Sequence, residues 1–331
     1  MMSKCRLFYT VLLAMALNCC SCKHYVSSSP ARVANATCDI VYGENSDWEG
    51  NEDSLKLDLY APKNFSKGET YPLVVFIHGG GFLNGDKKST IIPCSILADS
   101  GFIVASVNYR LGWDKGTNLC DGNIQELFDA GYRSVQDVNA ALRFLVSKAN
   151  LYSIDTNWIF LAGSSAGAIA ALHAAYLNDS NDISFFSEAK AKFGELNNAD
   201  NNFKANYSVK GICSVSGALV DSNFISKSKA IPTIFFHGEK DEIVPVDTGH
   251  YISCSNYPVI YGSLCLYRRL NATGVPAIAH ILPDAGHGKE GESEYSDEFK
   301  MSNTACFFHQ LMGKNLHASR IFMGNEDGCR D

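Results

Sequence analysis

The pentapeptide Gly-Ser-Ser-Ala-Gly at residues 163–167 constrains the fold of this 331-residue chain more than any other feature. The apolar run before it, Trp158–Ala162, is typical of a buried β-strand, and the alanine-rich segment 165–177 after it has the spacing of a helix that packs on a sheet. A strand that turns tightly into a helix at a serine between two glycines presents the hydroxyl beside the free N–H groups of the helix N-terminus. The pattern therefore predicts a nucleophile at Ser165. Ser164 is the alternative nucleophile, but alanines rather than glycines stand two residues before it and two residues after it.

Apolar strands that alternate with helices make up most of the remaining sequence. Buried-type strands are predicted at 73–78, 103–108, 209–216, 233–237 and 277–282, and helices at 134–149, 261–274 and 296–311. This alternation favours an α/β fold with a mostly parallel central sheet and helices on both faces. With 46% hydrophobic and 19% charged residues, and with no repeat or linker, residues 23–331 are expected to form one domain.

Four segments depart from this regular alternation. Leu55–Tyr60 alternates apolar and polar residues, which indicates a half-exposed antiparallel strand at a sheet edge. Residues 23–52 before it are polar and irregular. The stretches 112–131 and 178–207 are longer than plain connections, so each is either a lid or binding loop or a simple surface excursion.

The N-terminus carries an export signal. Lys4 and Arg6 precede an apolar stretch, Leu7–Leu17, that is too short to span a bilayer comfortably, so residues 1–22 are predicted to be a signal peptide. A lipoprotein anchor at Cys20 or a neighbouring cysteine is the alternative to soluble export. The protein is therefore expected to be secreted, or periplasmic or on the cell surface, and to meet a membrane only if it is lipidated.

Eight cysteines follow this segment, and an even number in an exported chain predicts disulfides. Proximity alone suggests the pairs Cys254–Cys265 and Cys306–Cys329, and Cys213 lies in an apolar run that is typical of a buried thiol. No cysteine or histidine cluster has the spacing of a metal site. The net charge of −7 and the lack of a basic stripe argue against a nucleic-acid partner.

Three consecutive glycines follow the strand at 73–77, in the sequence Ile-His-Gly-Gly-Gly-Phe at 77–82. Glycines extend a strand poorly, so the triplet is either a plain loop or a place where bare N–H groups approach a reacting atom.

A serine nucleophile needs a base, and the base needs an acid to orient it. His287 is the best candidate base, because it lies in a loop after the last predicted strand, at the sheet edge where such folds collect their active sites. Asp241 follows the strand at 233–237 and is the candidate acid. Glu239 and Glu242 are its close rivals.

Together these motifs resemble the α/β-hydrolase carboxylesterases and lipases with an HGGG motif, most closely their secreted bacterial members. The matching residues are His78-Gly79-Gly80-Gly81, Gly85-Asp86, Val107-Asn108-Tyr109-Arg110, Tyr132-Arg133, Asp137, residues 140–144, 163–167, His237-Gly238, Asp241, Val244-Pro245 and Gly286-His287. The order Ser165, Asp241, His287 is also the order of that family's triad.

The resemblance implies that the N–H groups of Gly80, Gly81 and Ala166 form an oxyanion hole, and that the enzyme uses no cofactor and no metal. Two departures are evident. Ser164 stands where the family often has an acidic residue, and the segment 217–230, where some relatives carry a lid, is short. A small lid or none is therefore expected, with an open site and without strong interfacial activation.

The predicted function is that of an exported serine carboxyl-ester hydrolase acting on a small-molecule or polymer-borne ester. Phe82 is a candidate wall of the substrate pocket, although packing explains an apolar residue there equally well. The alternatives are a serine peptidase on the same fold and a non-catalytic, hydrolase-like binding protein. The identity of the ester and the oligomeric state do not follow from the sequence.

Overall fold

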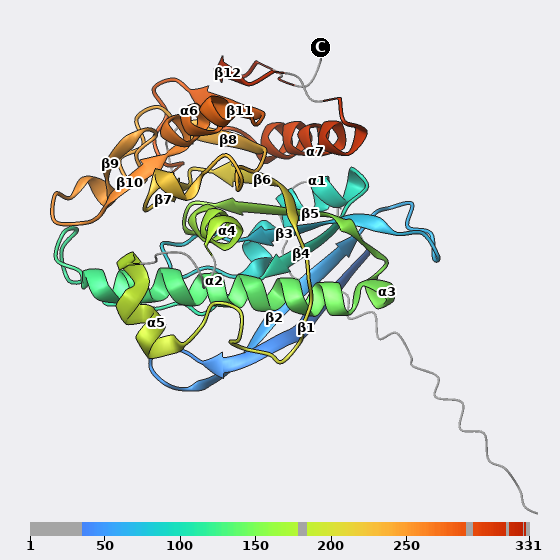
Figure 1. Ribbon diagram of the computed structural model, residues 1–331, viewed down its shortest axis with the longest axis horizontal. Coiled ribbons are helices and arrows are strands. Elements are labelled where there is room, and N and C mark those ends of the chain that lie inside the picture. The colour runs from blue at the N-terminus through green and yellow to red at the C-terminus, as the bar shows by residue number, and fades with distance from the viewer. Residues whose placement is uncertain (1–34, 178–183, 289–293, 316–317, 327, 329–331) are drawn as a thin grey trace, which may run out of the picture.

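The computed structural model describes residues 35–177, 184–288, 294–315, 318–326 and 328 (Figure 1). The predicted signal peptide and Cys329 lie outside these residues. Among the described helices, none combines the length and the apolar character needed to cross a membrane.

A nine-stranded sheet forms the centre of the described part of the chain, in the order β1-β2-β4-β3-β5-β6-β8-β11-β12. β2 pairs antiparallel with both of its neighbours, and every pair from β4 to β12 is parallel. The predicted mostly parallel sheet is confirmed. The strands are β1 (Asn35–Ser46), β2 (Glu52–Ala61), β3 (Tyr71–Ile77), β4 (Ile103–Val107), β5 (Ile154–Ser164), β6 (Val209–Val215), β8 (Thr233–Gly238), β11 (Ala277–Leu282) and β12 (Arg320–Met323).

Helices cover both faces of this sheet, as predicted (Figure 1). Alternate side chains of β3 point to opposite faces. Leu73, Val75 and Ile77 pack in the core beneath α2 (Ile124–Ser147) and α4 (Ala166–Tyr176). Val74 and Phe76 pack in a second core beneath α1 (Ile91–Asp99) and α7 (Asp297–Gly313).

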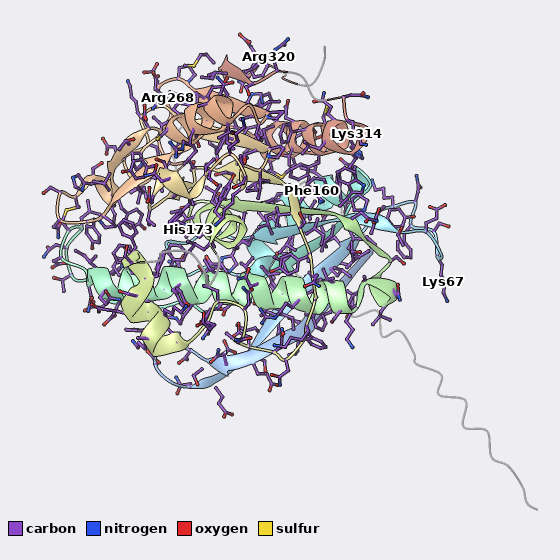
Figure 2. The ribbon with its side chains drawn as sticks, viewed as in Figure 1. Lys67, Phe160, His173, Arg268, Lys314 and Arg320 are labelled. Carbon is purple, nitrogen blue, oxygen red and sulfur yellow. A yellow bond between two sulfur atoms is a disulfide. The ribbon has the colours of Figure 1, made fainter. Side chains whose placement is uncertain are left out.

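Side chains fill the space between the sheet and the helices on both sides (Figure 2). On the α7 side, Phe160 of β5 stacks on Phe308 with ring centroids 4.1 Å apart. On the other side, α6 (Ser263–Thr273) packs against β8 and β11 in a third core that also contains Leu172 and Tyr176 of α4. Two short helices, α3 (Ala149–Tyr152) and α5 (Ser187–Phe193), complete the described α-helices.

Several elements differ from the prediction. The edge strand is β1, which was expected to be irregular, and β2 lies inside the sheet with Leu57, Asp58 and Tyr60 buried. β1 was missed because an edge strand with an exposed face tolerates polar residues. Helix α1 was also missed, as was a small antiparallel sheet of β7 (Ala218–Leu219), β10 (Val259–Gly262) and β9 (Thr248–His250).

Helix α2 begins ten residues earlier than predicted. The side chain of Asn123 caps it by accepting a hydrogen bond from the Glu126 N–H at 3.2 Å. The first of the two long irregular stretches is therefore partly helical. The second, from residue 184 on, packs along α2, where the Tyr132 hydroxyl donates to the Gly194 carbonyl at 2.7 Å.

Of the disulfides, the one whose two cysteines both lie among the described residues joins Cys120 and Cys254, whose Cα atoms are 5.6 Å apart. The suggested Cys254–Cys265 pair is therefore wrong, and Cys265 is a free thiol. The fold brings together two loops that are 134 residues apart in sequence, and the spacing of the cysteines does not predict this pairing. Cys213 is a buried free thiol, as expected. Cys38 and Cys306 are also disulfide-bonded.

Candidate active site

The turn from β5 into α4 holds Ser165 in a strained backbone conformation, with φ 52° and ψ −123°. Its N–H donates to the Val215 carbonyl at 2.8 Å, which ties the turn to β6. A Cβ at Gly163 would clash with the Gly167 carbonyl, and one at Gly167 would clash with the Ile77 carbonyl. Both glycines of the pentapeptide are therefore sterically required, and the hydroxyl of Ser165 stands at the N-terminus of α4.

His287 and Asp241 come together with Ser165 although they lie on loops after different strands. His287 Nε2 is 2.8 Å from Ser165 Oγ, and His287 Nδ1 is 2.6 Å from Asp241 Oδ2. The other carboxylate oxygen of Asp241 accepts the N–H groups of Ile243 and Val244, each at 2.9 Å. These bonds fix the carboxylate, so that it holds the imidazole in the tautomer whose Nε2 accepts a proton.

The two rival carboxylates lie away from His287. Glu239 is exposed and accepts the Asp284 N–H at 3.3 Å, and Glu242 is exposed as well. Only Asp241 of the three is buried against a histidine.

A second histidine also contacts Asp241. His237 at the end of β8 is buried, and its Nε2 lies 3.2 Å from Asp241 Oδ2 and 2.9 Å from the Val244 carbonyl. Burial would raise the pKa of Asp241, but the hydrogen bonds from His237 and His287 outweigh it and hold the pKa well below its ordinary value. Sequence reasoning treated His237 as an ordinary histidine, although its place four residues before Asp241 was a usable signal.

Each backbone carbonyl of the loop at 79–82 takes part in a hydrogen bond. His78 Nδ1 lies 2.7 Å from the Gly79 carbonyl, and Leu83 N–H donates to the Gly80 carbonyl at 3.0 Å. The indole N–H of Trp113 donates to the Gly81 carbonyl at 2.9 Å, and the Gly112 N–H donates to the Phe82 carbonyl at 2.7 Å.

These bonds hold the loop beside Ser165. A Cβ at Gly79 would lie 3.3 Å from the Cβ of Ser165. Gly80 has a φ of 117°, and a Cβ there would clash with the Asn84 carbonyl. The loop is thus a fixed turn that only glycine can form at residue 80.

His78, which precedes the glycines, stabilises this turn. Its ring stacks on Tyr109 with centroids 4.5 Å apart, and the Tyr109 hydroxyl donates to the His78 carbonyl at 2.9 Å. Burial lowers the pKa of His78, so the ring is neutral and its Nδ1–H donates to the Gly79 carbonyl.

Comparison with known proteins agrees with this geometry. Residues 57–221 match the family model BD-FAE. Esterase E4 of Myzus persicae is 32% identical over 142 residues, which cover 42% of this chain and 25% of that protein. The chain spans about a quarter of the length of the first curated relatives that it matches.

Solved esterase structures share the fold over most of the chain. A truncated carbohydrate esterase from gut microbiota is 18% identical, with a TM-score of 0.59 over 84% of this chain and 96% of that one. Esterase Est2 of Thermogutta terrifontis is 16% identical, with a TM-score of 0.56 over 84% of this chain and 92% of that one. The chain has the α/β-hydrolase fold, and part of its sequence is similar to carboxylesterases.

The family match covers only part of this α/β-hydrolase's site. It includes the glycine loop and the turn at Ser165 but ends before Asp241 and His287. His287 and Asp241 lie outside the matched residues, and the contacts of the folded chain place them beside Ser165.

Two cavities adjoin the site of this α/β-hydrolase. The first contains about 490 Å³ of empty space, part of it open to solvent, and is lined by Phe82, which follows the glycine loop, by residues of α2 and α4 and by Tyr251. The second contains about 430 Å³, part of it also open to solvent, and its lining includes Ser165, His287, Ser216 and Lys300. In the part of the chain that the structure describes, no group of three or more histidine, cysteine or acidic side chains is arranged to hold a metal ion.

Proposed function

We propose that this chain is an exported serine carboxyl-ester hydrolase that acts through an acyl-enzyme formed on Ser165. The observation that carries the proposal is the hydrogen-bonded series from Ser165 through His287 to Asp241, with the glycine loop beside it. The relationship to carboxylesterases supports the same reaction class.

In the first half of the proposed reaction, Ser165 Oγ attacks the ester carbonyl while His287 Nε2 accepts the hydroxyl proton. Asp241 orients the imidazole and stabilises the imidazolium. The tetrahedral intermediate then collapses, the bond from carbon to the alkoxy oxygen breaks, and His287 returns the proton to the leaving alcohol. In the second half, His287 takes a proton from water as the water attacks the acyl-enzyme. The bond from the acyl carbon to Ser165 Oγ then breaks, His287 returns the proton to Ser165 Oγ, and the acid is released.

The developing oxyanion is proposed to accept hydrogen bonds from the N–H groups of Gly80, Gly81 and Ala166. The carbonyls of Gly79 and Gly80, which share peptide planes with the N–H groups of Gly80 and Gly81, are bonded to His78 Nδ1 and to the Leu83 N–H, and Ala166 begins α4, whose N-terminus favours negative charge. One such donor typically contributes about 2.7–4 kcal/mol of transition-state stabilisation.

The decisive test is hydrolysis of p-nitrophenyl esters from acetate to palmitate by the wild type and by Ser165→Ala. We expect the wild type to turn over at least the short esters and kcat of the variant to fall about 10⁶-fold, to near background. A fluorophosphonate probe should label the wild type but not Ser165→Ala.

Ser164→Ala is the matched control, because it removes the neighbouring hydroxyl and keeps both flanking glycines. It should still be labelled by the probe. Labelling that survives Ser165→Ala but not Ser164→Ala would overturn the assignment of the nucleophile. A folded wild type that neither hydrolyses an ester nor reacts with the probe would favour a binding protein.

Export is proposed from the signal-like residues 1–22, and the Cys120–Cys254 disulfide is consistent with an oxidising compartment. Mass spectrometry of the mature N-terminus tests it. Cleavage near residue 22 without lipid would support soluble export, a diacylglyceryl group on Cys20 or a neighbour would support an anchor, and an intact Met1 would contradict both.

A further inference from the structure

The apolar cavity beside the glycine loop carries an inference about the substrate. We propose that this cavity binds the acyl group of the ester, that Gly131 of α2 keeps it open, and that the enzyme therefore prefers longer apolar acyl groups over acetate. This proposal rests on the function proposed above.

The cavity begins close to the reacting serine. Phe82 follows Gly81 directly, and Ile169 lies one helical turn after Ser165, to whose carbonyl its N–H donates at 2.9 Å. Tyr251 closes another side, and its hydroxyl lies 3.9 Å from the position that a Cβ on Gly81 would take. Ser165 itself does not line the cavity, so an acyl chain attached to its Oγ would reach the cavity past Phe82 and Ile169.

The walls of the cavity are apolar, including the one histidine that faces it. His173 donates from Nδ1 to the Ile169 carbonyl at 2.8 Å and accepts the Val220 N–H on Nε2 at 3.3 Å. Both ring nitrogens are thus satisfied by the backbone. Phe128, Phe186 and Ile260 contribute further hydrocarbon surface. Such a lining favours a hydrocarbon group and disfavours a sugar or a charged group.

The position of His287 identifies the acyl side. The leaving alcohol must lie near His287 Nε2 in order to receive its proton, so the acyl group points away from His287. His287 lines the second cavity, which also contains Ser216 and Lys300, and does not line the apolar one. The apolar cavity therefore takes the acyl part, and the polar cavity lies on the alcohol side.

Gly131 is the residue whose missing side chain leaves space in this cavity. It lies within α2, where glycine weakens a helix relative to alanine. Among the described residues, nothing lies within 4 Å of the place where its Cβ would be, whereas Gly163 and Gly167 are forced by close backbone contacts. Packing therefore does not require a glycine at 131. Gly131 lines the cavity, so a side chain there would occupy part of the cavity.

The expected selectivity follows from burial of methylene groups. Each CH₂ that the cavity buries should raise kcat/KM about fourfold until the cavity is filled. The lining extends from Phe82, next to Gly81, to Phe128 and Phe186, which is more hydrocarbon surface than an acetyl group can contact. We therefore expect p-nitrophenyl octanoate to have a higher kcat/KM than p-nitrophenyl acetate.

The test measures kcat/KM for acetate and octanoate in the wild type, Gly131→Leu and Gly131→Ala. Leucine at 131 should fill the cavity and lower the octanoate-to-acetate ratio at least tenfold. Alanine should lower it by less and, as a better helix former, serves as the second variant if leucine impairs folding. Ser147→Leu, at the exposed end of the same helix, is the matched control and should keep the wild-type ratio.

The outcomes separate this inference from the proposed function. Hydrolysis with a wild-type optimum at acetate, or a ratio that folded Gly131→Leu and Gly131→Ala leave unchanged, would overturn the inference alone. A wild type that hydrolyses no ester and resists the fluorophosphonate probe would overturn both. A falling ratio in the order wild type, alanine, leucine would support the cavity as the acyl site.

Discussion

At the scale of single residues, the carboxylate of Asp241 is the most densely bonded group of the site. It accepts two backbone N–H groups on one oxygen and faces His287 and His237 with the other. His237 is itself held by Ser263, whose Oγ lies 2.7 Å from its Nδ1. His237 thus acts as a positioning residue, because it touches Asp241 and not the reacting atoms.

Replacement of His237 tests this positioning. We expect His237→Phe to lower kcat of ester hydrolysis about tenfold with little change in KM, because Asp241 loses a buried donor and orients His287 less well. The onset of acid unfolding should also move to higher pH, since the low pKa of Asp241 depends on this donor. Ser263→Ala, which spares the contact to Asp241, is the control. Unchanged kcat and acid stability in folded His237→Phe would contradict the role.

His173 gives the molecule a predictable pH dependence. Burial lowers its pKa to about 4, and its Nε2 accepts a backbone N–H that protonation would displace. The unfolded chain binds this proton below about pH 6.5, so the free energy of unfolding should fall by about 3 kcal/mol between pH 7 and pH 4. Urea unfolding of the wild type and His173→Gln measures it. The variant does not titrate at this position and should lack that part of the pH dependence; equal slopes would refute the assignment.

At the scale of elements, the loop before α2 supports the glycine loop. Trp113 donates its indole N–H to the Gly81 carbonyl and packs edge-on against Tyr257, with ring centroids 6.5 Å apart. The Tyr257 hydroxyl accepts the Gly122 N–H at 3.0 Å, and the Cys120–Cys254 disulfide joins the same two loops. The position of the glycine loop therefore depends on a segment that supplies none of the proposed catalytic groups.

Removal of the indole donor tests this support. Trp113→Phe should lower kcat about tenfold, less than the loss of a whole oxyanion donor, because Gly80 and Gly81 keep their N–H groups but their loop loses a hydrogen bond that fixes its position. Steady-state kinetics with p-nitrophenyl butyrate measures the effect. Tyr257→Phe, which leaves the indole bond in place, should affect stability more than kcat. The support would be refuted if Trp113→Phe kept wild-type kcat.

At the scale of the whole molecule, the described residues are built around one nine-stranded sheet, with apolar cores on both of its faces. The proposed triad draws on the ends of β5, β8 and β11, so it exists only when the central strands are in register. Disruption of one half of the sheet would therefore separate Ser165 from His287.

This arrangement predicts one cooperative unfolding transition for the mature chain, because residues 23–331 are proposed to form a single domain. Near-UV circular dichroism, far-UV circular dichroism and loss of ester hydrolysis should give the same urea midpoint. Activity that disappears well before the secondary structure would point to a separately unfolding unit.

The sequence determined the features that depend on neighbours in the chain. The glycines around Ser165 and at Gly80 are visible in sequence because close backbone contact and positive φ leave no other residue possible. The parallel core strands were predicted with nearly their observed bounds, since burial on both faces requires continuous apolar runs. The elements that were missed, β1, β12, α1, α3, α5 and the small sheet, are polar, short or weakly patterned.

The tertiary structure decided the features that depend on contacts between segments distant in sequence. It brings Asp241 rather than Glu239 or Glu242 against His287, adds His237 to the same carboxylate and pairs Cys120 with Cys254. It also leaves open the space beside Gly131, which sequence alone cannot distinguish from an ordinary helical glycine. The physical reason is that periodicity and local sterics act over a few residues, whereas cavities, ion contacts and disulfides depend on how folded elements pack together.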